Sequence, residues 1–407
     1  MCEPKERIDE PTVGHGAGMI IKPAVVEKAI DTCEKQWGPG FKIFFSPQGQ
    51  KLDQFVFKKL AQQLNPDKQV SSDNIVHKNH IILICSRYEG IDARVEEHYA
   101  DLVLSIGDFV IMGGDLAAQV FLEGFLRLIP QIVGKQESVE NESFSSAFLD
   151  HPEYGLPVEW KDRTIPEILR SGNHGAVDVW RKDQAAEKTV QKRFDWFANA
   201  QPTQEEIDAA NKHIPTHYVA LLHSQVLIKN QQKIHTGNTS IASIDIHDAA
   251  RASATYGVKN VFIVTELEDQ QVILKTFLNF WTSDKGQNYN ATRHRAVSSV
   301  IPSPSLDFVI ESIKKQTGKD PIIIATSAKP YAQTPNIDYF SQGTVWRHQR
   351  PVLFVFGTGQ GLCNEVLNRC DFMLLPLTGL TKYNHLSVRS AISIVLDRWL
   401  GLHPKIR

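Results

Sequence analysis

The stretch Ser105-Ile-Gly-Asp-Phe-Val-Ile-Met-Gly-Gly-Asp115 decides how this chain is interpreted. It directly follows a short apolar strand predicted over residues 102–104, and it opens a helix predicted over residues 116–129. Glycines let the backbone approach a ligand closely, and the exposed N–H and C=O groups of such a loop can hydrogen-bond the edge of a purine. On its own, the stretch indicates a nucleotide-binding turn between a strand and a helix.

Short apolar runs of the same kind occur on both sides of this stretch. Upstream, strands are predicted over residues 42–45 and 80–85, with a helix from about Asp53 to Gln63 and a polar insertion over residues 65–78 between them. Downstream, strands are predicted over residues 219–222, 226–228, 260–265, 321–326 and 351–356, and helices over residues 245–256, 270–281, 306–316 and 387–400. Apolar strands that alternate with helices are typical of a parallel sheet covered on both faces, so both halves are expected to be α/β.

Composition limits the class of protein. A chain of 407 residues is long enough for two domains, and 44 basic against 46 acidic residues give no overall attraction to a polyanion. The five cysteines are scattered without a CxxC pair, which predicts a reduced cytosolic protein with neither a disulfide framework nor a zinc site. The first residues lack the apolar core of a signal peptide, and no apolar run is long enough to span a membrane. We therefore expect a cytoplasmic protein without a membrane partner.

The middle of the chain is predicted to connect two domains. Residues 141–162 contain no clear period and are expected to form a loop, whereas residues 163–215 are mostly helical and polar. Thr203 and Glu206 fit a capping box that starts a helix after Pro202. We therefore expect a first domain over residues 1–162, a helical linker over residues 163–215 and a second domain over residues 216–407.

Several ordered blocks of the first half resemble the bacterial tRNA (guanine-N1)-methyltransferases, which belong to the trefoil-knotted SPOUT class. The resemblance covers roughly residues 9–197 and is carried by Asp9–Met19, Ser46–Gly49, Arg87–Asp92, Ser105–Asp115, Ser171–His174 and Trp180-Arg181. It implies a SPOUT-like domain with a mostly parallel sheet, a knot that no periodicity could reveal, and a homodimer.

The resemblance also implies a binding site for S-adenosylmethionine (AdoMet) formed by three loops. The residues expected to surround the cofactor are Ser46, Pro47, Gln48, Gly49, Ser86, Tyr88, Glu89, Gly90, Ile106, Gly107, Asp108, Phe109, Val110, Ile111, Gly113 and Gly114. The resemblance also suggests a requirement for Mg²⁺, for which the sequence offers no dedicated set of ligands.

Methyl transfer to N1 of guanine needs a base, because that nitrogen carries a proton at neutral pH. The family uses an aspartate in an acidic-Asp-Ser-Phe segment, and this chain reads Asn141-Glu-Ser-Phe144, so Glu142 is the expected base. Its stem is one methylene longer, and Glu140 is a possible substitute. Arg127 matches a family arginine beside the target guanine, and Glu89 is expected to attract the cationic methionine end of AdoMet. The alternatives are solvated loop carboxylates and an ordinary surface arginine.

Two further features bear on the substrate and on the start of the sheet. A basic run is expected either to contact tRNA phosphates or to be a solvated helix face; it consists of Arg181, Lys182, Lys188, Lys192 and Arg193. tRNA, and not DNA, is the implied partner.

Family members place a strand and a helix before the glycine-rich segment, which here starts at residue 9. Either the start of the sequence is wrongly assigned or the sheet lacks its first strand.

The second half carries a similar set of loops. Gly357-Thr-Gly-Gln-Gly-Leu362 follows a predicted strand, but it comes late in its domain and fails the GxGxxG spacing of a Rossmann fingerprint. Together with residues 374–379 and 383–390 it resembles the AdoMet loops of SPOUT proteins. Asp245–Arg251, Tyr289–Arg293 and Tyr383–Arg389 resemble a SAM-dependent RNA methyltransferase family, and this resemblance covers about residues 217–401. The implied cofactor contacts are Phe356, Gly357, Gly359, Gly361, Leu375, Leu377, His385 and Ser387. His247, Arg251, Asn290 and Arg293 are candidate contacts to RNA, whose identity the sequence does not give.

The sequence therefore predicts an AdoMet-dependent enzyme that methylates N1 of the guanine just 3′ of a tRNA anticodon, with a second RNA methyltransferase domain. One alternative is a non-catalytic protein that binds RNA or AdoMet through a decayed first site. In the other, only the second domain is active, on a different RNA.

Overall fold

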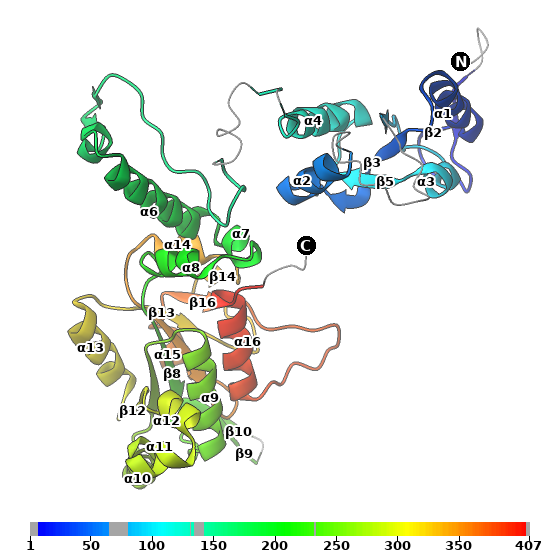
Figure 1. Ribbon diagram of the computed structural model, residues 1–407. Helices are drawn as coiled ribbons and strands as arrows, with labels where there is room; N and C mark the ends of the chain where they lie inside the picture. Colours follow the sequence, from blue (N-terminus) through cyan, green and yellow to red (C-terminus); the bar gives the residue numbers. More distant parts are fainter. Residues whose placement is uncertain (1–6, 65–79, 131, 134–141, 232, 404–407) are drawn as a thin grey trace. The chain divides into compact units, whose positions relative to one another are not determined.

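The computed structural model describes residues 7–64, 80–130, 132–133, 142–231 and 233–403 (Figure 1). The chain divides into two compact units between Ser145 and Ser146. We call the part before this point unit 1 and the part after it unit 2, and each is described by itself. The predicted polar insertion over residues 65–78 falls outside the described residues, and so does Glu140, the possible substitute base.

Unit 1 contains a parallel sheet with strand order β4 (Ile81–Ile84), β3 (Phe41–Lys51) and β5 (Leu102–Ser105). Ile43 and Phe45 of the central strand pack with α2 (Gln54–Gln63) and α4 (Gly114–Leu126). Phe44, which points to the opposite face, packs with α1 (Pro23–Trp37) and α3 (Ala93–Tyr99). This alternation confirms the prediction of a parallel sheet covered on both faces.

The two helices next to the predicted loops begin close to where the sequence places them. Asp53 caps α2, because its carboxylate accepts a hydrogen bond from the backbone N–H of Val56 at 2.9 Å. α4 begins at Gly114, two residues before the predicted start, and ends at Leu126, three residues before the predicted end. An antiparallel hairpin of β1 (Asp9–Pro11) and β2 (Met19–Ile21) carries the glycine-rich entry segment.

Unit 2 contains a seven-stranded sheet in which every pair of neighbouring strands is parallel. The strand order is β12 (Val300–Ser303), β11 (Asn260–Val264), β8 (His217–Leu222), β15 (Val352–Gly357), β13 (Ile322–Ala325), β16 (Phe372–Leu374) and β14 (Asn336–Ile337). A hairpin of β9 (Val226–Asn230) and β10 (Lys233–Gly237) follows the first strand of this sheet. The α/β prediction for the second half is confirmed.

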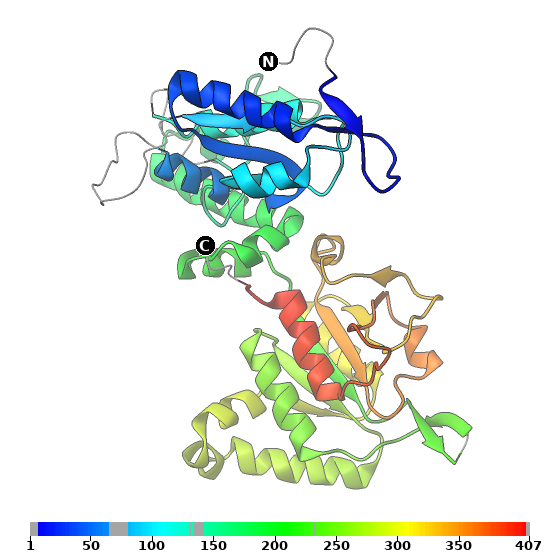
Figure 2. The same ribbon diagram turned by 90° about the vertical axis from the view of Figure 1, so that its right-hand side faces the viewer.

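Helices cover both faces of this sheet (Figure 2). Val219 and Leu221 of β8 face one core, whereas Tyr218 and Ala220 face the other. The first core is completed by α9 (Ser243–Thr255), α10 (Glu268–Thr282), α12 (Ala291–Val297), α14 (Gln342–Trp346) and α16 (Val388–Leu400). The second is completed by α13 (Leu306–Thr317) and α15 (Asn364–Leu367), while α11 (Asp284–Tyr289) connects α10 to α12.

The segment predicted to link two domains packs into the first core of unit 2. It comprises β6 (Glu159–Trp160), β7 (Arg163–Thr164), η2 (Glu167–Arg170), α6 (His174–Lys192), α7 (Phe194–Asn199) and α8 (Gln204–Asn211). Phe194 meets Trp346 edge to face at 4.8 Å between ring centroids. The predicted capping box is present at the start of α8, between Thr203 and Glu206. The chain therefore divides after residue 145, and the domain boundaries at 162 and 215 stay predictions.

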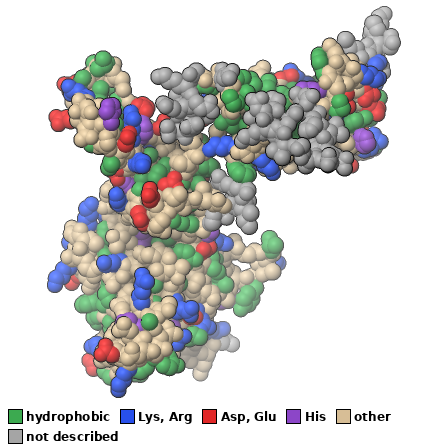
Figure 3. Space-filling view, viewed as in Figure 1, with side chains coloured by type: hydrophobic (Ala, Val, Ile, Leu, Met, Phe, Trp, Pro, Cys, Tyr) green, Lys and Arg blue, Asp and Glu red, His purple; other side chains and the backbone are tan. Residues whose placement is uncertain are grey.

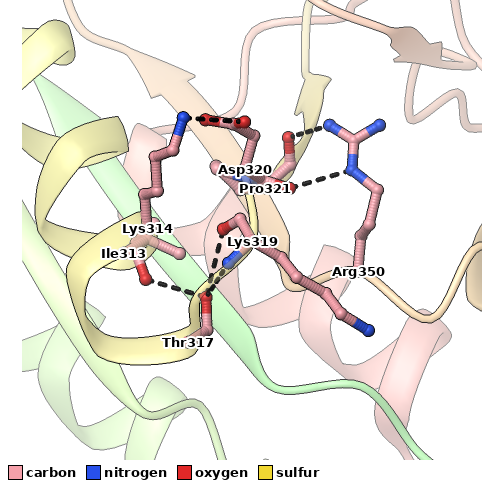
Figure 4. A network of polar contacts seen from close by, with 7 residues as sticks. All are labelled: Ile313, Lys314, Thr317, Lys319, Asp320, Pro321 and Arg350. Carbon is pink, nitrogen blue, oxygen red and sulfur yellow. Dashed lines mark hydrogen bonds and ion pairs between the residues drawn. The ribbon is translucent and has the colours of Figure 1, made fainter.

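A network of polar contacts fixes the entry to β13, which lies in the sheet between β15 and β16, the two strands followed by candidate cofactor loops (Figure 4). Lys314 of α13 donates to the Asp320 carboxylate at 3.1 Å, and the Arg350 guanidinium donates to the backbone oxygens of Asp320 and Pro321 at 2.9 Å each. Gly318 ends α13 with φ +74°, a conformation that favours glycine. The turn between α13 and β13 is thus held at both its ends.

His217 is a buried polar side chain at the start of β8. Its Nε2 accepts hydrogen bonds from the indole N–H groups of Trp346 and Trp399, each at 3.2 Å. Burial lowers the pKa of His217 to about 4. The side chain is therefore neutral in the folded protein at neutral pH, and the two indole donors fix which ring nitrogen carries no hydrogen.

We expect unit 2 to lose stability as the pH falls below about 6.5, the usual pKa of an unfolded histidine. Between that value and about 4, the unfolded chain binds a proton that the folded His217 does not accept. The free energy of unfolding should fall by about 2 kcal/mol at pH 5 from this residue alone. Denaturant unfolding followed by tryptophan fluorescence at pH 7 and 5 measures the change. His217→Gln should reduce this pH dependence of the free energy of unfolding. An unchanged pH dependence in this variant would contradict the role of His217.

None of the helices in the described part of the chain is long and apolar enough to cross a membrane.

Candidate active site

Three loops of unit 1 follow the ends of its parallel strands, and the first interrupts β3 itself. Phe45 and Gln50 both pair with Leu104 of β5, so the four residues Ser46–Gly49 loop out between them. A Cβ on Gly49 would lie 2.7 Å from backbone atoms of Leu104, so no other residue fits there without movement. The carboxyl ends of parallel strands meet at one edge of a sheet, which is where ligands bind in open α/β folds.

The second loop lies against the start of α4. The backbone N–H of Gly114 donates to the carbonyl of Ser86 at 2.8 Å, and Arg87 forms an isolated antiparallel bridge with Gly113. A Cβ on Gly114 would lie 2.9 Å from Cα of Cys85. The Arg87 guanidinium forms an ion pair with Asp115 at 2.8 Å. Glycine is therefore required at Gly114 because the second and third loops touch there, whereas the expected approach of the backbone to a ligand stays a prediction.

The third loop, Ile106–Gly114, presents apolar side chains to solvent. The Ser105 hydroxyl and the backbone of Gly107 hydrogen-bond to each other at 3.1 and 3.3 Å, and the ring of Phe109 lies over Gly107. Lys51 of β3 pairs with Asp108 at 2.8 Å and ties the loop to the end of the central strand. Phe109, Val110 and Met112 are exposed although they are large and apolar. Such an apolar rim around backbone donors and acceptors suits a ligand with both an adenine ring and polar groups.

The structure brings the two expected catalytic side chains together. Arg127, at the C-terminal end of α4, forms an ion pair with the Glu142 carboxylate. Both side chains are partly exposed, and the Ser145 hydroxyl and backbone N–H hold the backbone oxygen of Glu142 at 2.6 and 3.1 Å. The longer side chain of Glu142 therefore reaches Arg127, the arginine that is expected to lie beside the target guanine.

Glu89 contacts a segment that the sequence analysis quoted without assigning its residues to the site. A Cβ on Gly18 would lie 2.6 Å from Oε1 of Glu89, and the backbone N–H of Glu89 donates to Met19 at 3.0 Å. Gly18 has φ +91°, which favours glycine. The β1–β2 hairpin thus packs beside the second loop, and the three glycines between residues 14 and 18 were the signal for this contact.

The glycine-rich loop after β15 of unit 2 is closed by hydrogen bonds to neighbouring segments. The Thr358 hydroxyl donates to the carbonyl of Leu222 at 2.9 Å, and the Leu227 N–H donates to Gly361 at 2.7 Å. Gly359 and Gly361 have φ +61° and +109°, and a Cβ on Gly359 would lie 2.6 Å from the carbonyl oxygen of Leu227. The expected contacts Gly359 and Gly361 therefore lie on one tight turn, whereas Phe356 and Gly357 end strand β15 and the Phe356 side chain is buried in the first core.

The other expected cofactor loops of unit 2 follow β16, which β13 separates from β15 in the sheet, and precede α16. The Leu375 N–H donates to Ile337 at 2.9 Å, while the Tyr339 hydroxyl donates to the Leu375 carbonyl at 3.1 Å. Leu377 packs against the first core. Ser387 caps α16 by accepting a hydrogen bond from the N–H of Ser390 at 3.3 Å, and His385 is exposed.

The basic run on α6 is only partly available to a ligand. Lys188 donates to the backbone oxygen of Asp150 at 2.7 Å, and Arg193 pairs with Asp195 at 3.0 Å, which raises the pKa of the guanidinium. Arg181 is half-buried, 3.9 Å from Asp178. Within the described residues, no hydrogen bond or ion pair engages the exposed ammonium groups of Lys182 and Lys192.

One group of side chains in the described part of the chain has donors close enough to hold a metal ion: Asp150, His151 and Glu153. Nδ1 of His151 lies 3.4 Å from Glu153, and Nε2 lies 3.8 Å from Asp150, so the carboxylates approach opposite ring nitrogens. Mg²⁺ prefers oxygen ligands in octahedral geometry. This group does not fit the Mg²⁺ that the resemblance implied, and no chemical step is assigned to it.

Comparisons with known proteins cover both units. Residues 2–199 match a family model described as tRNA (Guanine-1)-methyltransferase TrmD, and residues 216–401 match one described as SAM-dependent RNA methyltransferase. A protein of Nitratidesulfovibrio vulgaris named tRNA (guanine-N(1)-)-methyltransferase is 37% identical over 97% of this chain and 88% of its own length. A protein of Oleidesulfovibrio alaskensis with the same name is 35% identical over the same shares. A shorter match, 40% identical, comes from Deinococcus radiodurans and covers 49% of this chain and 66% of that protein.

Proposed function

This chain belongs to the tRNA (guanine-N1)-methyltransferase family, and from that premise we propose that unit 1 methylates N1 of the guanine just 3′ of a tRNA anticodon. The methyl donor is AdoMet, and the protein is a SAM-dependent RNA methyltransferase. The observation that carries the proposal is the pairing of Glu142 with Arg127 in the same unit as three glycine-bearing loops.

The reaction needs one proton acceptor and one stabiliser of negative charge. The Glu142 carboxylate accepts the N1 proton of guanine, and the freed electron pair of N1 forms a bond to the methyl carbon. The bond between sulfur and that carbon breaks, and its electron pair returns to the sulfonium, which leaves as a neutral thioether. Arg127 donates to the guanine oxygen O6, where negative charge develops as the proton leaves. The ion pair between Arg127 and Glu142 must break before the guanine ring can enter between them.

The three loops of unit 1 are assigned to AdoMet because their contacts leave backbone groups and apolar side chains for a ligand. The assignment includes the residues expected from the sequence in Ser46–Gly49, Ser86–Gly90 and Ile106–Gly114. Glu89, whose carboxylate lies beside Gly18, is proposed to face the cationic methionine end of the cofactor. We also propose that the chain forms the trefoil knot of its class and works in the cytoplasm on tRNA, not on DNA.

We propose that unit 1 forms a homodimer through α4. Leu116, Val120 and Leu126 are 61%, 50% and 40% exposed on one side of this helix, although they are large and apolar. A contiguous exposed apolar face of this kind marks a protein contact.

Leu116→Asp combined with Val120→Asp should convert the dimer to a monomer, because two carboxylates would be buried without partners. Light scattering coupled to size-exclusion chromatography measures the mass. Gln36→Asp, at an exposed position of α1 on the other face of the sheet, is the matched control. A wild-type chain that elutes as a monomer would refute the homodimer.

tRNA is proposed to contact the free lysines of α6. Lys182→Glu and Lys192→Glu should each weaken tRNA binding, and each should reduce the slope of log affinity against log salt by about 1, as for one lost phosphate contact. Fluorescence anisotropy at several salt concentrations measures both. Lys212→Glu removes another exposed lysine, outside the run, and should leave the slope unchanged. Equal slopes for all three variants and the wild type would exclude the contact.

Unit 2 is proposed to hold a second AdoMet in the loops after β15 and β16, for transfer to an RNA that the structure does not identify. The family match and the glycines of residues 357–361 support this assignment.

The function is tested by incubating the full chain with labelled AdoMet and two tRNA transcripts that differ only at the base 3′ of the anticodon. Methyl groups should enter the transcript with guanine and not the one with adenine. Equal labelling of both would assign the activity to another position, and no labelling of either would favour a protein that binds without reacting.

A further inference from the structure

Unit 2 carries a cluster of aromatic rings at the surface formed by α9 to α12. His247 of α9 meets the rings of Phe277 and Trp281 edge to face, at 5.0 and 4.9 Å between centroids. Tyr289, at the end of α11, meets Trp281 at 5.9 Å and is 73% exposed. A tyrosine ring that is largely free of the core is available to stack on a flat ligand.

Basic side chains surround these rings. The Arg293 guanidinium lies 5.2 Å from the centre of the Trp281 ring, and Lys285 and Arg295 come from the same two short helices. Asp284 is the single acidic residue of α11 and α12, so these helices carry a net positive charge. Figure 3 shows basic and hydrophobic side chains next to one another over this end of unit 2, where Figure 1 places α10, α11 and α12.

A cavity of about 380 Å³ between α9 and α16 adjoins this surface, since α9 packs against both α12 and α16. Its lining includes Arg251, Arg389 and the hydroxyl groups of Ser390 and Ser393. Within the described residues, no hydrogen bond or ion pair engages the Arg251 guanidinium. Arg389 lies 3.9 and 3.8 Å from the carboxylates of Asp245 and Asp248, which is too far for good hydrogen bonds. Both guanidinium groups therefore retain donors for a ligand.

This surface leads to the proposed second cofactor site. Arg389 follows Ser387, the last residue assigned to the AdoMet loops of unit 2, by two positions. Tyr289, Arg251 and Arg389 therefore form a path along the surface of unit 2. The path starts at an exposed aromatic ring, passes several positive charges and ends at the loops where a methyl group would be transferred. A substrate of a methyltransferase has to reach that place.

We propose that the face of unit 2 running from Tyr289 and Arg293 to the cavity at Arg251 and Arg389 binds single-stranded RNA. An unpaired base stacks on Tyr289, and the two cavity arginines bind backbone phosphates. A duplex does not fit this recognition, because its bases are already stacked on one another. The inference rests on the proposed methyltransferase function of unit 2, and it narrows the unidentified target to an unpaired segment of RNA.

The test uses the full chain and a fluorescent single-stranded RNA of mixed sequence and twelve nucleotides. Tyr289→Ala should weaken binding about tenfold, whereas Tyr289→Phe, which keeps the ring, should bind as the wild type does. Arg251→Gln should weaken binding and lower the salt slope by about 0.7, as for one phosphate contact on a single strand. Phe340→Ala removes another exposed ring of unit 2, 79% exposed and outside the surface, and should change nothing.

Two further measurements separate this inference from the proposed function. Photocrosslinking of the same RNA carrying 4-thiouridine, followed by mass spectrometry, should label peptides that contain Tyr289 or Arg293. AdoMet binding by each variant, measured by calorimetry, should equal that of the wild type. If two equivalents of AdoMet bind while Tyr289→Ala and Arg251→Gln bind RNA like the wild type, the RNA surface is wrong and the cofactor site of unit 2 stands. If the RNA effects appear without an AdoMet site in unit 2, the surface stands and the methyltransferase assignment of unit 2 fails. Equal competition by a duplex would overturn the preference for single strands.

Discussion

Glu142→Gln should slow methyl transfer to tRNA at least 10²-fold and leave the affinity for AdoMet unchanged. The amide keeps the shape of the side chain, but it cannot accept the N1 proton of guanine, and a positioned general base contributes about 10²- to 10⁴-fold. The structure gives a specific reason to choose this carboxylate, because it is the partner of Arg127. Single-turnover transfer of labelled methyl groups measures the rate, and calorimetry measures the affinity.

Two controls accompany this substitution. Glu311→Gln removes an exposed carboxylate of α13 in unit 2 and should leave the rate within about twofold of the wild type, as expected for a surface position. Glu142→Asp keeps a carboxylate, so it should be faster than Glu142→Gln although its stem is shorter. Full activity of Glu142→Gln would show that another group takes the proton.

Gly49→Ala and Gly359→Ala should each remove one of two AdoMet sites per chain. The new methyl group of Gly49→Ala would lie 2.7 Å from the backbone of Leu104, and that of Gly359→Ala would lie 2.6 Å from the carbonyl oxygen of Leu227. In both variants the new methyl group meets backbone atoms, which cannot rotate away as a side chain can, so the loop must shift. A shift of about 1 Å is enough to disrupt a positioned ligand. Calorimetric titration should give two equivalents for the wild type and one for each variant.

Gly175→Ala is the matched control for these two substitutions. Its Cβ would meet only the side chain of Asn173, at 3.8 Å, which is an ordinary contact. It should therefore bind two equivalents. If Gly49→Ala and Gly359→Ala also bound two equivalents with wild-type affinity, the glycine loops would not be the cofactor sites.

The sequence predicted the sheets and their loops well, because the signals are local. Continuous apolar runs predicted β8, β11, β13 and β15, and the glycines at 49, 114, 357 and 359 lie where the structure leaves no room for a side chain. The expected roles of Arg127 and Glu142 followed from the family resemblance, whereas the ion pair between them was not predicted. The assignments of individual cofactor contacts stay predictions.

Contacts between distant parts of the chain could not be predicted from the sequence. The helices of residues 163–215 seemed to be a polar linker, but Phe194 and Phe197 are buried with Trp346 in the core of unit 2. The cavity between α9 and α16 joins Arg251 to Arg389, which are far apart in the sequence. The hairpin of β1 and β2 was not predicted because its strands have only three residues each, too few to show an alternation of apolar and polar residues. The helix α1 was not predicted either, although it buries Val26 and Ile30 at helical spacing.

The atom that receives the methyl group is the most direct test of the central claim. tRNA methylated by the full chain can be digested to nucleosides and analysed by mass spectrometry against methylguanosine standards. The account predicts 1-methylguanosine, up to one per tRNA, formed by the wild type and at most in traces by Glu142→Gln. Another methylated nucleoside as the main product, or equal amounts of 1-methylguanosine from the wild type and Glu142→Gln, would contradict it.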